Sequence, residues 1–133
     1  MSVGERQLMD SALPTSGRRH RVLIVDDEPA LLDAMRLAFE GAGRHVVACR
    51  SFEEARSRLL AEDFDAMVTD VRLGAFNGIQ LAVIARDRNR SMAIVVFSGF
   101  DDPVLREEAA HLGATYVVKP VTAEHLLELM ADL

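Results

Sequence analysis

Five short and continuous apolar runs recur along the chain, and each is followed by a segment with the apolar spacing of an amphipathic helix. Strands that are apolar throughout, and not only at every second residue, are typical of a parallel sheet covered on both faces. Right-handed crossovers then predict an α/β fold, in which a doubly wound five-stranded sheet forms the middle of a three-layer sandwich. The runs lie at residues 21–26, 44–50, 65–70, 92–97 and 115–118, and the predicted helices at 29–43, 51–62, 78–88, 102–113 and 122–133.

Local signals at the helix starts support this pattern. Pro29 and Pro103 each stand where the first residue of a helix is expected, a position at which proline loses no hydrogen bond. Ser51 and Glu54 have the spacing of a capping box, in which side chains and backbone N–H groups bond reciprocally. Thr122 is the predicted cap of the last helix.

The chain has the length of a single domain. Its 133 residues are 50% hydrophobic and include no Trp, so we predict one mainly aliphatic core. Residues 1–19 are polar and contain Pro14 and Gly17, and we expect a disordered tail there. Residues 20–133 form the predicted domain.

Charge and cysteine usage narrow the classes of partner and compartment. The formal net charge of -6 argues against direct binding to nucleic acid or to an anionic membrane. The single Cys49 cannot form an internal disulfide, which fits a reducing compartment. Since no apolar run has the length of a transmembrane helix, we expect a cytoplasmic protein.

Charged and polar residues follow the predicted strands at the point where each ends. Asp26 and Asp27 follow the first run, Asp70 ends the third, Ser98 follows the fourth and Lys119 follows the fifth. In an open parallel sheet these ends form one edge, where ligands bind. Neighbouring carboxylates repel one another, and Mg²⁺ with oxygen ligands relieves this. Carboxylates, Mg²⁺, an ammonium and a hydroxyl describe a phosphoryl-transfer site, with Asp70 as the nucleophile.

Each of these residues taken singly also has a structural explanation. Asp27 could cap the helix that begins at Pro29, and Ser98 could belong to a turn. Lys119 could be a surface residue before a proline. The conjunction of all of them at the strand ends of one fold is what favours a site.

Four segments together resemble the receiver domain of bacterial two-component response regulators: VLIVDDEPALL, AMVTDVRLGAFNGIQL, VVFSGF and GATYVVKPV. The resemblance covers residues 21–133. It implies a flavodoxin-like fold with strand order 2-1-3-4-5. It also implies a switch and not an enzyme with free substrates, because receivers accept a phosphoryl group from a sensor histidine kinase or a phosphotransfer protein and then change a partner-binding surface.

The resemblance implies a role for each residue of the acidic edge. Asp70 would be the phosphoacceptor. Asp27 and Asp70 would bind Mg²⁺ through their carboxylates, with the main-chain carbonyl of Arg72 as a third protein ligand. Asp26 would hold a metal-bound water.

Three further residues are implied to act around the phosphoryl group. Lys119 would pair first with Asp70 and then with the phosphoryl group, a task that suits a compact ammonium better than a planar guanidinium. Ser98 would move to donate a hydrogen bond to a phosphoryl oxygen, and Tyr116 would rotate after this movement. The Lys119–Pro120 bond is implied to be cis, and the partner surface is expected on the fourth helix, fifth strand and fifth helix, with Leu129 facing outward.

The sequence departs from the family in the loop after Asp70. Gly74 replaces the usual proline and Asn77 the usual acidic residue, so the loop is less restricted before folding. Two alternatives stay open, a constitutive pseudo-receiver and a phosphatase of the haloacid dehalogenase type. The phosphatase would need a second Asp where Arg72 stands. A downstream protein target, an output domain in a longer chain and a phosphorylation-dependent homodimer are all open as partners.

Overall fold

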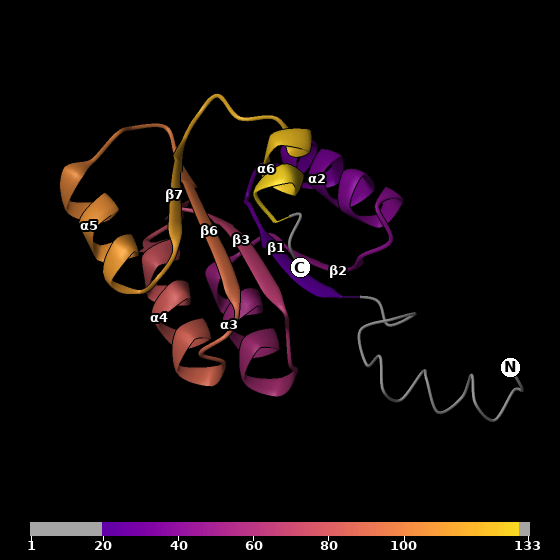
Figure 1. The fold of residues 1–133 in the computed structure, drawn as a ribbon, viewed down its shortest axis with the longest axis horizontal. Coiled ribbons are helices and arrows are strands. Elements are labelled where there is room, and N and C mark those ends of the chain that lie inside the picture. The colour runs from indigo at the N-terminus through magenta and orange to yellow at the C-terminus, as the bar shows by residue number, and fades with distance from the viewer. Residues whose placement is uncertain (1–19, 131–133) are drawn as a thin grey trace, which may run out of the picture.

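The computed structural model describes residues 20–130 (Figure 1). The predicted tail at residues 1–19 lies outside the described residues. The strands are β1 (Arg21–Val25), β2 (His45–Cys49), β3 (Ala66–Asp70), β4 (Arg72–Leu73), β5 (Phe76–Asn77), β6 (Ala93–Ser98) and β7 (Thr115–Val118). The helices are α2 (Pro29–Gly41), α3 (Phe52–Ala61), α4 (Gly78–Arg88), α5 (Pro103–His111) and α6 (Ala123–Leu129).

The main sheet has five parallel strands in the order β2-β1-β3-β6-β7. This order is the predicted 2-1-3-4-5 once the two short strands β4 and β5 are set aside, so the predicted fold class is confirmed. In the register of β1 and β3, Val25 lies opposite Thr69. The residues that follow, Asp26 and Asp70, therefore leave two neighbouring strands at the same level of the sheet.

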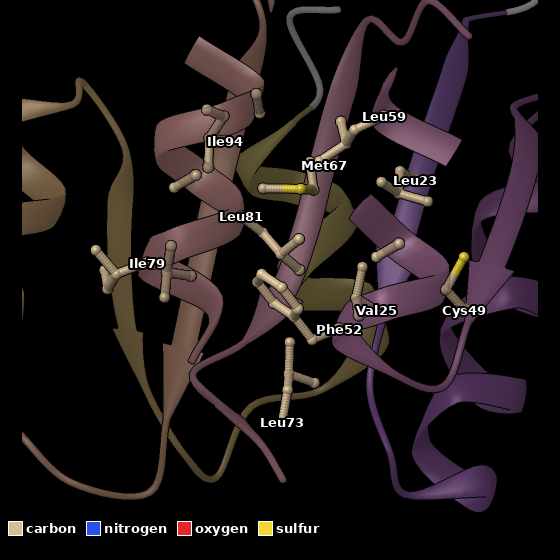
Figure 2. Packing of buried hydrophobic residues seen from close by; sticks show 14 of the residues in the cluster. Leu23, Val25, Cys49, Phe52, Leu59, Met67, Leu73, Ile79, Leu81 and Ile94 are labelled. Carbon is tan, nitrogen blue, oxygen red and sulfur yellow. The ribbon is translucent and has the colours of Figure 1, made fainter. Parts of the chain in front are cut away.

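Helices cover both faces of the sheet, as the continuous apolar strands predict (Figure 1). Helices α3, α4 and α5 pack on one face and α2 and α6 on the other. Successive strand residues point to opposite faces, so Leu23 and Met67 belong to the first core while Ile24 and Val68 belong to the second. Figure 2 shows the first core, where strand side chains such as Leu23 and Met67 meet those of α3 and α4.

Most of the predicted start signals are confirmed. Proline stands in the first turn of α2 and of α5, and the Thr122 side chain accepts a hydrogen bond from the His125 backbone N–H. The Ser51 side chain caps α3 by accepting from Glu54 N. The reciprocal half of this capping box is different, because the Glu54 carboxylate accepts from the backbone N–H of Arg50 at 2.9 Å.

The predicted helix ends need correction in two places. The helices α2 and α5 end at residues 41 and 111, two residues earlier than predicted. Gly43 and Gly113 have φ angles of 87° and 69°, a left-handed backbone that cannot continue a helix. The last helix ends at Leu129, and residues 131–133 of its predicted extent lie outside the described residues.

Two expectations near the C-terminus are confirmed. The Lys119–Pro120 peptide bond is cis. In α6, Ala123 and Leu126 are buried while Leu129 is 41% exposed. Within residues 20–130, no helix combines the length and the apolar composition that a membrane span requires.

The segment after Asp70 is more ordered than the predicted loop. Strands β4 and β5 form an antiparallel hairpin in which Arg72 pairs with Asn77 and Leu73 with Phe76. The Asn77 side chain then starts α4 through a capping box with Gln80. This hairpin, residues 72–77, therefore joins the end of the central strand β3 to the first turn of α4.

Candidate functional site

Three carboxylates meet at the carboxyl edge of the sheet. Asp26, Asp27 and Asp70 each offer an oxygen atom, and these atoms lie within 4.8 Å of one another. Asp26 and Asp70 are buried, whereas Asp27 is exposed. The predicted convergence of the strand ends thus brings the acidic residues together. The alternative in which Asp27 caps α2 is wrong, since Glu28 occupies the cap position.

Burial shifts the ionisation of both inner carboxyl groups. Desolvation raises the pKa of Asp26 from 3.8 to about 6, and the neighbouring Asp70 and Asp27 act in the same direction. The Glu28 backbone N–H and Lys119 oppose this shift. Desolvation also raises the pKa of Asp70, against the opposing effect of Lys119 and of the Arg72 backbone N–H. Lys119 and the two backbone N–H groups therefore offset only part of the cost of burying these two carboxylates in their ionised form.

The residues present fit a divalent cation. The Oδ1 atom of Asp26 accepts a hydrogen bond from Glu28 N at 2.8 Å, but its Oδ2 atom is buried without a hydrogen-bond partner. A buried carboxylate oxygen is costly unless it is paired or binds a metal. Three carboxylates against one nearby ammonium leave a formal charge of about -2 at this edge, which a divalent cation with oxygen ligands would balance.

Lys119 supplies the ammonium of this edge. Its Nζ lies 3.2 Å from Asp70 Oδ2 and 5.2 Å from the centre of the Phe97 ring. The Lys119 backbone N–H donates to Ser98 O at 2.7 Å, which joins the end of β7 to that of β6. The lysine side chain is 31% exposed and stands before a proline, but it is also a partner of Asp70.

Arg72 contributes backbone and side chain to different contacts. Its backbone N–H donates to Asp70 Oδ1 at 3.2 Å, so the hairpin begins with a bond to the central carboxylate. Its guanidinium carbon lies 5.4 Å from the centre of the Phe100 ring, in the loop after β6. The side chain thus reaches across the edge to the opposite loop.

Ser98 and Tyr116 both contact the backbone of Phe100. Ser98 is 4% exposed, and its Oγ accepts from Phe100 N at 3.2 Å. This contact is the turn predicted as the structural alternative for Ser98. The Tyr116 hydroxyl donates to Phe100 O at 2.8 Å, and the Arg106 guanidinium carbon lies 4.9 Å from the centre of its ring. Tyr116 is thereby held in a buried, inward position.

Gly78 lies against the backbone of Asp70, and its importance is not evident from the sequence alone. A Cβ built on it would lie 2.2 Å from the backbone oxygen of Asp70 and 2.9 Å from the side chain of Thr69. Its backbone N–H donates to Val71 O at 2.8 Å. Only glycine lets α4 start this close to the end of β3. The available signal is the Asn-Gly pair at the predicted start of the helix.

Asp26 predicts an unusual dependence of stability on pH in the metal-free protein. Its carboxyl group binds a proton more tightly in the folded chain than in the unfolded one. Folding is therefore penalised above about pH 6, and the penalty disappears as the pH falls from there towards 3.8. We expect this group to raise the free energy of unfolding by about 1 kcal/mol between pH 7 and pH 5.

Urea denaturation with a chelator present, at both pH values, measures this difference. The variant Asp26→Asn serves as the control, since it keeps the shape of the side chain without the titration. Subtracting its pH dependence removes every effect that the two proteins share. An equal change in wild type and variant would contradict the prediction.

The comparisons with known proteins agree with this geometry. A family model described as the response regulator receiver domain matches residues 22–131. The chain is 32% identical over 113 residues to the alginate biosynthesis transcriptional regulatory protein AlgB of Pseudomonas aeruginosa, covering 84% of this chain and 25% of that protein. It is 31% identical over 121 residues to the sensory/regulatory protein RpfC of Xanthomonas campestris pv. campestris, covering 87% and 17%. The chain thus spans about a quarter or less of the length of these curated relatives.

Two solved structures of receiver proteins are similar to this chain in fold and in sequence. A response regulator receiver domain protein (CheY-like) from Methanospirillum hungatei has a TM-score of 0.80 and 27% identity, over 86% of this chain and 92% of that chain. A response regulator receiver protein from Sinorhizobium medicae has a TM-score of 0.75 and 29% identity, over 86% and 94%.

Proposed function

Since this chain belongs to the response regulator receiver family, we propose that Asp70 is the residue that accepts the phosphoryl group. The observation that carries the proposal is the contact of Asp70 with Lys119 in the middle of the acidic cluster. Asp26 lacks such a contact among the described residues and has an unpaired oxygen instead. Asp27 lies at the exposed rim.

Mg²⁺ is the cation that we propose for this edge. The carboxylates of Asp27 and Asp70 and the main-chain carbonyl of Arg72 would hold it, and the unpaired oxygen of Asp26 would accept a hydrogen bond from one of its waters. When bound, the ion neutralises carboxylate and phosphoryl charge. Two features support this choice. All four protein groups offer oxygen atoms, and the formal charge at this edge is about -2.

The residues of the chain would perform the transfer as follows. An oxygen of Asp70 attacks the phosphorus of a phosphohistidine, forming an acyl phosphate while the P–N bond breaks and the imidazole leaves. The Lys119 ammonium, already 3.2 Å from Asp70, moves its charge to the phosphoryl oxygens.

The donor in this proposal is a sensor histidine kinase or a phosphotransfer protein, and the recipient of the signal is a downstream protein or an output domain. Two observations count against the phosphatase alternative. The chain matches the receiver family model, and Arg72 stands where the phosphatase reaction needs its second aspartate. A constitutive pseudo-receiver is the remaining competitor. All five acidic, hydroxyl and ammonium positions are occupied here, which favours a working receiver.

Incubation with acetyl phosphate and Mg²⁺, followed by intact-protein mass spectrometry, tests the proposal. A receiver should gain one covalent phosphate, and it should gain none when a chelator is present. Continuous turnover of acetyl phosphate without a stable adduct would indicate the phosphatase instead. An unmodified protein would indicate the pseudo-receiver.

Phosphorylation should act on the loop after β6. The Ser98 hydroxyl proton is free to donate to a phosphoryl oxygen while its Oγ accepts from Phe100, and Phe100 O accepts from Tyr116. A phosphoryl group bonded to Ser98 would therefore favour the inward position that Tyr116 has in this structure over an outward one. The arrangement of the face formed by α5, β7 and α6 would change with it. Phe100, Val104 and Leu129 expose apolar side chains there.

Beryllofluoride with Mg²⁺, a mimic of the acyl phosphate, tests this route by NMR. We expect large amide shifts from Ser98 to Asp102 and around Tyr116, and suppression of these shifts in Ser98→Ala. The matched control Ser91→Ala changes an exposed serine before β6 and should leave them intact. Shifts confined to the acidic cluster would show that the route is wrong.

A further inference from the structure

Gly74 leaves the backbone of the hairpin at residues 72–77 with few conformational restrictions. Its φ angle is +66°, a left-handed conformation that proline cannot adopt. A glycine at this point also leaves the open hairpin with more conformations to lose when it becomes ordered. Other contacts must therefore hold the segment that carries the Arg72 carbonyl, and the buried side chain of Leu73 supplies one of them.

The tip of the hairpin has little support from the rest of the protein. Gly74 and Ala75 are exposed. On the side that faces Asp27 and Arg50, the hairpin borders a cavity of about 250 Å³ and not a packed surface. Among the residues around this cavity, Phe52 contacts the hairpin through a stacked ring.

A ring stack connects the hairpin to the start of α3. The rings of Phe52 and Phe76 lie 4.5 Å apart between centroids, with 14° between their planes. Phe52 is the first residue of α3 and belongs to the core, and Figure 2 shows it in one cluster with Leu73. Phe76 is 40% exposed, and the stack is the ring contact that attaches it to α3.

The position of Phe76 is transmitted to Arg72 through the hairpin itself. Phe76 pairs with Leu73 across the two strands, and Leu73 follows Arg72 directly. At the other end Arg72 N is bonded to Asp70. Fixing the Phe76 ring therefore holds the Leu73 end of the short strand whose carbonyl is in question, while Asp70 holds the Arg72 end.

We propose that the Phe52–Phe76 ring stack is a positioning device for the metal site, which holds the hairpin so that the Arg72 carbonyl is available to a divalent cation at Asp27 and Asp70. The stack limits the freedom that Gly74 leaves to the turn, at a φ angle where proline could not stand. This inference rests on the proposed function, because it assumes the cation at the acidic cluster. It makes Phe76 a determinant of metal affinity without contact to the metal.

The test measures Mg²⁺ affinity from amide shifts of Asp27 and Val71 in the unphosphorylated protein. A stacked aromatic pair changes an equilibrium roughly 2- to 12-fold, and the apparent affinity falls by up to this factor, which is reached where the binding-competent hairpin is the minor form. Phe76→Ala should therefore weaken Mg²⁺ binding measurably, by up to about 12-fold. Phe76→Tyr keeps the ring and should bind Mg²⁺ as the wild type does.

Leu60→Ala is the matched control. Leu60 lies on α3, as Phe52 does, and its side chain is 45% exposed, close to the 40% of Phe76. It should leave the affinity unchanged. Equal affinity in wild type and Phe76→Ala, or equal loss in the Ala and Tyr variants, would overturn the inference alone. A wild-type protein that binds no Mg²⁺ at Asp27 and Val71 would overturn the proposed metal site together with the inference.

Discussion

We expect Asp70→Asn to abolish covalent labelling by acetyl phosphate. The substitution keeps the shape of the side chain, but an amide oxygen does not form an acyl phosphate. We expect neither of the other two members of the cluster to replace it, because Asp70 is the member in contact with Lys119. Lys119 contacts Asp70, and its ammonium is needed where phosphoryl charge develops.

Intact-protein mass spectrometry after incubation with acetyl phosphate and Mg²⁺ measures the label. Asp63→Asn is the matched control, since Asp63 lies before β3 at the opposite end of the sheet. The control should be labelled as the wild type is. Labelling of Asp70→Asn at the wild-type level would mean that another residue is the phosphoacceptor.

Much of the fold follows from the sequence because its signals are local and repeated. Each strand of the main sheet is a continuous apolar run, and each helix has its own start signal, as Pro29 and Thr122 illustrate. The topology of parallel strands then brings Asp26 and Asp70 to one edge without any knowledge of side-chain packing. For this reason the acidic cluster could be predicted before the structure was known.

The remaining features depend on contacts between distant segments. The stack of Phe52 on Phe76 joins the start of α3 to the hairpin, and neither residue is distinguished in the sequence from an ordinary core or surface phenylalanine. Two-residue strands such as β4 and β5 are too short to show a period. The left-handed backbone at Gly74 likewise becomes evident only when the turn is seen.

Gly78→Ala should destabilise the protein more than any surface substitution. The new Cβ would lie 2.2 Å from the backbone oxygen of Asp70, and backbone atoms at the end of a central strand cannot move aside as a flexible side chain can. Helix α4 would have to shift away from β3, breaking the bond from Gly78 N to Val71 O. We expect the free energy of unfolding to fall by about 3 kcal/mol or more.

The same substitution at Gly41 isolates the steric cause. Gly41 is the last residue of α2, and a Cβ there would meet nothing within 4 Å. Gly41→Ala should be neutral or should stabilise by up to about 1 kcal/mol, because alanine loses less backbone freedom in a helix. Urea denaturation of both variants gives the comparison. Equal stabilities would mean that the approach of α4 to Asp70 is looser than the structure indicates, and Gly78 would then have no special part in presenting the proposed phosphoacceptor.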